Sequence, residues 1–181
     1  MKKILLVLTV AAMFAACNNA KKEEAKEETK AAEAPKEAVK LAFTPAYSAS
    51  FEMGNPAYAA MIVQGSWKDW EINSMDNMKS WLADTIVAFH SDNVMTQGAD
   101  SLIARWKRGR ANYKTVIDTV HAVIPVYSTD KNENWVLVWA NEINTDLKGK
   151  IDTTELQETW RINKDGKADM LLQFDRHTRK K

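Results

Sequence analysis

Residues 133–146 read Glu-Asn-Trp-Val-Leu-Val-Trp-Ala-Asn-Glu-Ile-Asn-Thr-Asp, and the domain is expected to be built around this segment. Side chains of a β-strand alternate between two faces. One face would carry Trp135, Leu137, Trp139, Asn141 and Ile143, and the other Val136, Val138, Ala140, Glu142 and Asn144. Both sets begin apolar, which is typical of a strand that is covered on both sides. We expect a central strand of a curved sheet.

Three further extended segments accompany this strand. Alternating, β-branched and aromatic residues predict strands at residues 114–127, 134–146, 150–162 and 167–177. Turn-forming stretches at 128–133, 147–149 and 163–166 separate them. Strands joined by such short turns run in opposite directions, because a parallel pair needs a long crossover. The second half of the chain is therefore predicted to form an antiparallel meander of four strands.

Helical periodicity precedes the meander. Asn55 as cap and Pro56 at the first helical position predict a first helix. A second, shorter helix is expected from residue 73 or 74, a short strand at 85–90 with 94–97 as candidate partner, and a third helix from 99 or 100 to about 113. The inward-facing residues of the three helices would be Ala59, Val63, Trp67 and Trp70, then Met75, Met78, Trp81 and Leu82, then Leu102, Ile103 and Trp106. Three helices packed on a curved, mainly antiparallel sheet define the class as α+β.

The N-terminal region predicts export and anchoring. A basic start at residues 1–3 precedes an apolar run over 4–14, which is shorter than the roughly 20 residues of a membrane-spanning helix. Residues 14–17, Phe-Ala-Ala-Cys, resemble the lipobox of bacterial lipoproteins, which implies a signal peptide over 1–16 and lipidation of Cys17. Residues 17–50 would then be a disordered tether rich in Lys, Glu and Ala with a lead-in, and residues 51–181 the folded domain.

The resemblance to lipoproteins also implies a location. Asn18 stands where an aspartate favours retention at the inner membrane, so we expect a lipid-anchored protein of the cell envelope, at the outer membrane and on its periplasmic face. The membrane is thus the first expected partner.

Charge and cysteine content exclude several classes of function. From residue 41 onward there are 17 Lys and Arg against 18 Asp and Glu, whereas nucleic-acid binders normally concentrate positive charge. No nucleic acid is expected as a partner. Cys17 is the only cysteine, so neither an internal disulfide nor a zinc–cysteine cluster is expected. The only histidines, His90, His121 and His177, are not at ligand spacing, and no metal or other cofactor is expected.

The order of the elements resembles the cone-shaped nuclear transport factor 2 (NTF2)-like superfamily, and within it the SnoaL-like proteins. Residues 81–90 (WLADTIVAFH) resemble that family's helix end and first strand, 98–102 (GADSL) the glycine that opens its third helix, and 160–167 (WRINKDGK) its penultimate strand and hairpin. The resemblance covers roughly residues 55–177. It implies a pocket at the wide end of the cone, where ketosteroid isomerases, polyketide cyclases and limonene epoxide hydrolases carry an aspartate with partner groups. No local motif here matches their catalytic residues.

Polar side chains interrupt apolar strand faces at Glu158, Asn141, Asp118, Asp175 and His177. A polar group in such a place is paired, solvated in a pocket, or functional. Asp175 and His177 lie two apart on one face, where Asp175 could orient His177 for proton transfer. The alternative is that both are exposed where the strand frays. Asp175, His177 and Glu158 are the candidate catalytic residues.

Six of the seven tryptophans are expected to point inward and to wall a pocket for a small apolar or aromatic ligand. With Asn141, the candidate ligand-binding residues are Trp67, Trp70, Trp81, Trp106, Trp139 and Trp160. Core packing is the simpler explanation for the same pattern.

Three functions stay open from the sequence. The first is binding of a small ligand or a protein partner in the cone pocket. The second is an isomerase, cyclase or hydrolase that uses a pocket carboxylate and histidine as acid and base. The third is a structural module that forms a homodimer.

Overall fold

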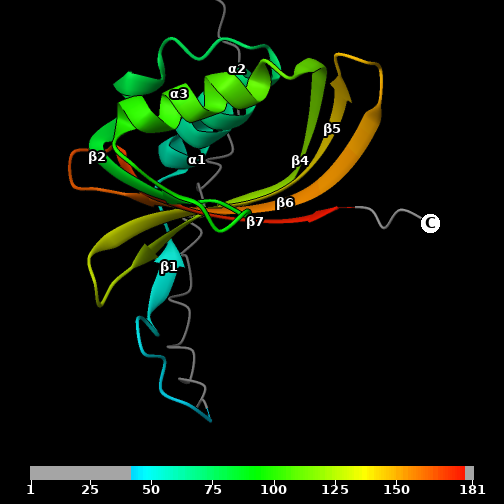
Figure 1. The fold of residues 1–181 in the computed structure, drawn as a ribbon. Helices are drawn as coiled ribbons and strands as arrows, with labels where there is room; N and C mark the ends of the chain where they lie inside the picture. Colours follow the sequence, from blue (N-terminus) through cyan, green and yellow to red (C-terminus); the bar gives the residue numbers. More distant parts are fainter. Residues whose placement is uncertain (1–41, 178–181) are drawn as a thin grey trace, which may run out of the picture. The chain divides into compact units, whose positions relative to one another are not determined.

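A computed structural model describes residues 42–177 (Figure 1). In this part of the chain seven strands form one sheet, in the order β1-β4-β5-β6-β7-β2-β3. The strands are β1 (Phe51–Met53), β2 (Leu82–Phe89), β3 (Met95–Gln97), β4 (Tyr113–Ser128), β5 (Glu133–Asp146), β6 (Ile151–Ile162) and β7 (Ala168–His177). The helices lie on one side of the sheet, and β4, β5 and β6 curve toward them (Figure 1). The α+β class is confirmed.

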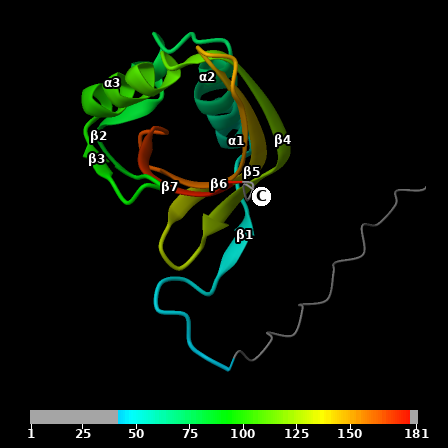
Figure 2. The same ribbon diagram turned by 45° about the vertical axis from the view of Figure 1, so that its right-hand side comes forward.

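The predicted meander is confirmed as β4–β7, with antiparallel pairing at each step. Gly149 and Gly166 hold φ angles of 84° and 75° in two of its turns, a conformation that glycine adopts without steric cost. The β4/β5 register shifts between Val120 and Ala122, and such bulges bend a strand. The curved sheet and the helices surround the interior of the domain (Figure 2). Because β7 also pairs in parallel with β2, the sheet is mixed.

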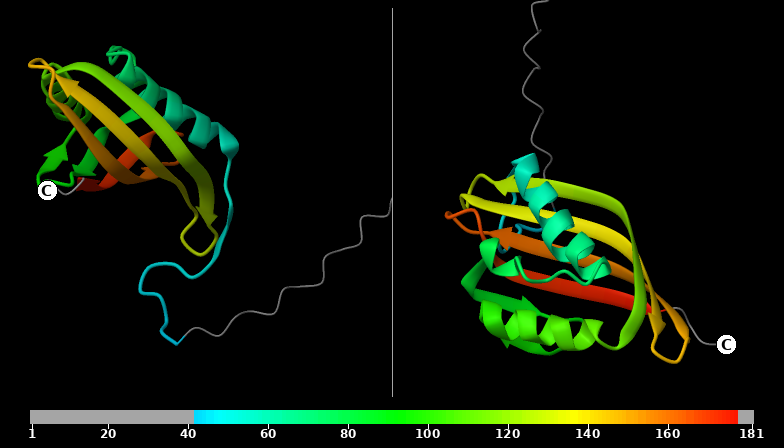
Figure 3. Two further views of the ribbon diagram at one scale, coloured as in Figure 1. Left: turned by 90° about the vertical axis from the view of Figure 1, so that its right-hand side faces the viewer. Right: turned by 90° about the horizontal axis from the view of Figure 1, so that it is seen from above.

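The first helical segment is a continuous rod made of α1 (Pro56–Ile62), a π-helical stretch (Val63–Lys68) and α2 (Asp69–Glu71). Its start is as predicted, since Asn55 Oδ1 accepts a hydrogen bond of 2.9 Å from the Ala57 N–H. A Cβ added to Gly65 would lie 2.4 Å from Trp81 Nε1, so the absent side chain of Gly65 makes room for that indole. Figure 3 shows this rod and α3 (Ala99–Arg110) on the same side of the sheet.

The predicted second helix is wrong. Residues 72–81 form turns, with a single 3-10 turn at Met78–Ser80, and β2 begins at Leu82 rather than at residue 85. Asn73 takes a positive φ of 57°, which ends the preceding helix. Trp81 O accepts a hydrogen bond of 2.8 Å from Ala168 N, and Leu82 pairs with Ala168. Pairing with β7 thus draws this segment into the sheet. The third helix also ends earlier than predicted, at Arg110.

Alternation separates the two faces of β5 correctly. The face that points inward is the one with Val136, however, and not the one with Trp139 as predicted. Val136, Val138 and Ala140 are buried against the helices, whereas Ile143 on the other face is exposed. The core contains the buried residues Ile62, Met78, Leu82, Ile86, Leu102, Val136, Val138, Trp160, Ile162 and Leu171. The face of the sheet that carries them is called the inner face below, and the opposite face the outer face.

The lead-in contacts the domain at its outer face. The Tyr47 and Trp135 rings meet edge to face at 6.0 Å, and Ser48 Oγ donates to Asp130 at 2.6 Å. Within residues 42–177 no helix has both the length and the apolar character needed to cross a membrane. The signal peptide, Cys17 and most of the tether lie outside the described residues.

Candidate functional site

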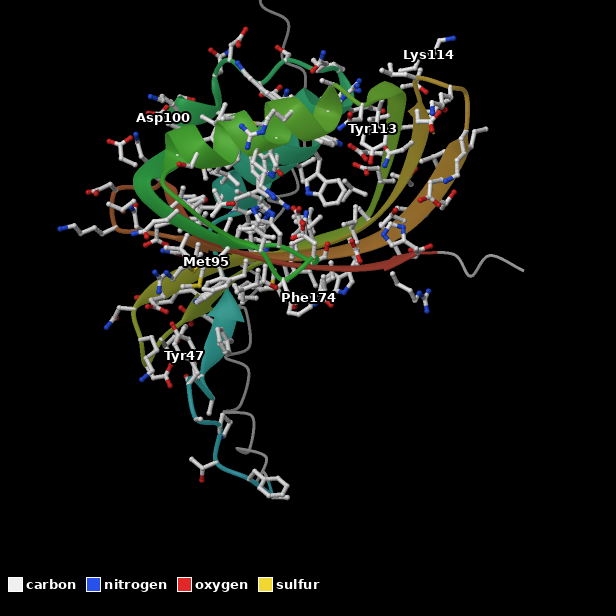
Figure 4. The ribbon with its side chains drawn as sticks, viewed as in Figure 1. Tyr47, Met95, Asp100, Tyr113, Lys114 and Phe174 are labelled. Carbon is white, nitrogen blue, oxygen red and sulfur yellow. The ribbon has the colours of Figure 1, made fainter. Side chains whose placement is uncertain are left out.

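A cavity of about 530 Å³ lies between the inner face and the helices. Trp67 and Trp70 of the first helical rod and Trp106 of α3 contribute its aromatic wall. Three carboxyl groups from the strands also line it, those of Glu142, Glu158 and Asp175. Figure 4 shows the side chains that fill the region between helices and sheet, with Tyr113 facing it and Phe174 on the opposite, outer side of β7. The cavity is therefore aromatic and acidic at once.

Glu158 is the most deeply placed of these acids, with 4% of its surface exposed. Its carboxylate accepts hydrogen bonds from Trp160 Nε1 at 3.0 Å and from Gln173 Nε2 at 2.9 Å. Burial raises the pKa of Glu158 to about 7, and the two hydrogen bonds oppose that shift because they favour the charged form. At neutral pH this carboxyl group can therefore either hold or release a proton.

Glu142 lies on β5, across from Thr154 of β6. It accepts hydrogen bonds of 2.6 Å from Trp70 Nε1 and from Asn144 Nδ2. Burial raises the pKa of Glu142, and these two donors counteract the rise. The hydrogen bond from the Trp70 indole thereby connects the helical rod to β5. It also holds the Glu142 carboxylate in place in the cavity wall.

Asp118 lies beside Glu142 on β4, directly opposite it in the β4/β5 ladder. Its carboxyl oxygens are buried and accept no hydrogen bond from any residue in 42–177. Burial, followed by the negative charges of Glu142 and Glu71, raises the pKa of Asp118 to about 8. Asp118 is thus mostly protonated at neutral pH. Asp118 does not line the cavity but stands behind Glu142.

Arg110 connects the helices at this end of the domain. Its guanidinium donates to the carbonyl oxygens of Trp70, Glu71 and Tyr113 at 2.9, 3.0 and 2.9 Å. Its positive charge lowers the pKa of Asp118, but less than burial and the neighbouring carboxylates raise it. The donors of Arg110 are largely used by the backbone.

Asp175 and His177 lie at the open end of the cavity, on the last residues of β7. The distance from His177 Nε2 to Asp175 Oδ2 is 3.6 Å, and His177 Nδ1 also lies 3.5 Å from Asp152 Oδ2. Ser91 Oγ donates to Asp175 at 2.6 Å. The His177 side chain is 56% exposed. The structure therefore brings the predicted pair to the cavity but with no direct hydrogen bond between them.

The predicted tryptophans fall into three groups. Trp67, Trp70 and Trp106 line the cavity. Trp81 and Trp160 are core residues, with ring centres 5.6 Å apart and an edge-to-face arrangement.

Trp139 and Asn141 lie on the outer face, paired with Gln157 and Glu155, so their assignment to the pocket is wrong. Period-two alternation separates two faces but does not say which one the helices cover.

Sequence reasoning missed Glu142, Asn144 and His90, all of which line the cavity. Glu142 and Asn144 share the alternation of Val136 and Val138, so the correct face assignment would have found them. His90 is buried at the end of β2, and burial, with the charge of Arg105, lowers its pKa. Nothing in its local sequence marks that position.

No protein-family model and no curated protein matches this sequence. Solved structures do match the fold. An epoxide hydrolase of the limonene epoxide hydrolase (LEH)-like type from Mycobacterium tuberculosis has a TM-score of 0.54 at 11% identity, over 66% of this chain and 84% of that one. The Δ5-3-ketosteroid isomerase from Mycobacterium sp. has a TM-score of 0.53 at 16% identity, over 67% and 98%. A putative SnoaL-like polyketide cyclase from Jannaschia sp. has a TM-score of 0.53 at 12% identity, over 66% and 83%.

At such low identity these matches establish the fold and nothing about chemistry. The domain therefore shares its fold with these SnoaL-like, isomerase and hydrolase structures.

Proposed function

We propose that the domain binds a small molecule in this cavity, with an aromatic or apolar body against Trp67, Trp70 and Trp106 and a polar group toward Glu158. The observation that carries the proposal is a cavity of about 530 Å³, the size range of ligand pockets, that leads to a buried carboxyl group. A purely apolar ligand fits less well, because it would bury Glu142 and Glu158 without new hydrogen bonds.

Native mass spectrometry of the full chain, purified from its own host, tests this proposal. We expect a co-purifying small molecule on the unaltered chain and about tenfold weaker retention after Glu158→Gln, the loss that one hydrogen bond to a charged group produces. Glu155→Gln makes the same chemical change on the outer face, where Glu155 is exposed, and is the matched control. Equal retention by both variants would exclude Glu158 from binding, and a consistently empty chain would contradict binding itself.

Acid–base catalysis is the second candidate function, and the pKa of about 7 at Glu158 favours it. A general base works best when its pKa is near the operating pH. Glu158 would remove a proton from a bound substrate and return it at another atom, as an isomerase does. Asp175 and His177 stay the alternative acid–base pair.

A Δ5-3-ketosteroid, the substrate class named for the similar mycobacterial isomerase, is a suitable first probe. Turnover that falls with Glu158→Gln supports catalysis at that residue, and turnover lost only with His177→Ala would move the chemistry to the cavity mouth. Equal rates for the unaltered chain and both variants count against either site.

Lipid anchoring at Cys17 belongs to the same proposal. A cleaved, acylated cysteine would place the domain on the outer membrane, facing the periplasm, where envelope metabolites could reach the cavity. Several acyl chains would hold it durably, since each buried methylene contributes about 0.8 kcal/mol. We expect radioactive palmitate to label the unaltered chain and to leave Cys17→Ser unlabelled and soluble after fractionation. Labelling of Cys17→Ser would contradict the anchor, because the chain has no other cysteine.

The homodimer stays a proposal as well. Ile117, Ile143 and Phe174 expose 53%, 36% and 59% of their surfaces on the outer face, which supports a contact made through the sheet. Light scattering that shows a monomer at high protein concentration would reject it.

A further inference from the structure

Two buried polar atoms in the cavity wall make no direct hydrogen bond within residues 42–177: Asn144 Oδ1, an acceptor, and Trp67 Nε1, a donor that is close enough to the Glu158 carboxylate to lower the pKa of that group. Both residues line the cavity, and each exposes only 5% of its surface. A buried polar group left without a partner costs free energy, so most such groups in native proteins are paired. A ligand with a hydrogen-bond donor near Asn144 Oδ1 and an acceptor near Trp67 Nε1 would give both atoms a partner.

The orientation of the Asn144 amide follows from its neighbour. Its other amide atom, Nδ2, lies 2.6 Å from Glu142 Oε1. An ionised carboxylate only accepts hydrogen bonds, so the atom that faces Glu142 must be the amide nitrogen. The free atom is consequently the oxygen. Glu142 and Asn144 therefore both present hydrogen-bond acceptors to the cavity, and a ligand would have to supply the hydrogen-bond donor.

The charges around this pair favour a cationic donor. None of the ion pairs within residues 42–177 includes Glu142. Of the cationic side chains near the cavity, Arg105 is bound to Asp92 at 2.6 Å, and Arg110 is bound to three carbonyl oxygens. Arg108 and His177 are exposed at the cavity lining.

The acids outnumber the cations at the buried end. The carboxylate of Glu158 is close enough to Glu142 for the two charges to interact, whereas Asp118 is neutral while it is protonated. A positive charge placed beside Glu142 would therefore also be attracted by the ionised form of Glu158. Trp70 and Trp106 add aromatic faces, which attract cations as well.

We propose that the ligand of this cavity carries an ammonium group, which donates to the Glu142 carboxylate and to Asn144 Oδ1, and that a hydroxyl or carbonyl group at its other end accepts from Trp67 Nε1. The inference rests on the proposed binding function and narrows it to aromatic or apolar amines. The ammonium group supplies up to three donors, enough for both acceptors.

Tyramine is a suitable probe, because an ammonium group and a phenolic hydroxyl stand at opposite ends of one ring. Tyrosol, in which a hydroxyl replaces the ammonium group, is its neutral counterpart, and 4-hydroxyphenylacetate is an anionic one. In calorimetric titrations of the full chain we expect tyramine to bind about tenfold more tightly than tyrosol, as for a charge-assisted hydrogen bond in place of a neutral one, and the anion to bind least. Glu142→Gln should abolish the preference for tyramine, while Glu155→Gln should keep it.

The outcomes separate the ammonium inference from the binding function. The ammonium inference is rejected if tyrosol binds as well as tyramine, or if a folded Glu142→Gln variant still prefers tyramine. Either result leaves the proposal of binding in the cavity intact. If Glu142→Gln does not fold, the comparison of tyramine with tyrosol on the unaltered chain decides alone. If none of the three probes binds at millimolar concentration, the ammonium inference fails, and an empty chain in native mass spectrometry then also removes the binding function.

Discussion

Trp160→Ala is expected to lower the free energy of unfolding by about 3 to 5 kcal/mol, the usual cost of removing a buried tryptophan from a core. Trp160 has no exposed surface, and its ring meets Trp81 at 5.6 Å and Trp106 at 6.1 Å edge to face. Alanine would leave a cavity between the sheet and both helical segments. It would also remove the indole donor that supports the Glu158 carboxylate, so the pKa of that group should rise further. Urea unfolding of the full chain measures the loss.

Trp139→Ala is the matched control, since it deletes the same side chain from the outer face of the neighbouring strand. Trp139 is only partly buried, so its loss should cost clearly less. If the two variants lose the same stability, then the core does not lie between the inner face and the helices.

Asp118→Asn is expected to stabilise the domain at pH 8 and to change little at pH 4. In the folded domain the pKa of Asp118 is about 8, whereas its ordinary value is 3.8. Between these values the folded state binds more protons than the unfolded state, so stability falls as the pH rises from 4 to 8. Asparagine cannot ionise and escapes this loss. We expect a gain of about 2 kcal/mol at pH 8, below the full linkage value because solvent partly screens the charge.

Glu158 contributes a parallel slope over a narrower window, from its ordinary 4.5 to about 7, so the unaltered chain should already be more stable at pH 5 than at pH 8. Urea midpoints at both pH values measure the two effects. Glu155→Gln again serves as control and should leave the slope unchanged, because Glu155 is exposed on the outer face. A midpoint for Asp118→Asn that falls at pH 8 would falsify the view that this carboxyl group is uncompensated.

Local patterns predicted the elements whose ends carry their own signals. Asn55 and Pro56 start the first helix as expected, and the glycine turns separate the strands of the meander close to the predicted residues. The failure at residues 73–82 has a different origin. Met75, Met78 and Trp81 have helical spacing and are buried as predicted, but the hydrogen bond from Ala168 to Trp81 is a long-range contact that no local window contains.

The candidate site divides in the same way. Glu158, Asp175 and His177 could be singled out because each is a polar residue in an apolar or alternating strand. The distances between these three residues could not be predicted. They depend on the β6/β7 register, which pairs Thr154 with His177 and Glu158 with Gln173.

An α+β chain with a four-strand meander could be predicted from local patterns, because alternation, caps and turns are properties of neighbouring residues. Which face of the sheet is inside became clear from the packing of the helices. That packing places Glu142 and Asn144 at the cavity and Trp139 and Asn141 outside it. Alternation alone allows either face to be the inner one, and the choice between the two depends on where the helices pack. The same packing buries Asp118 and Glu158 and raises the pKa of each. Such a shift depends on the surroundings of the group and therefore cannot be predicted from the residue type alone.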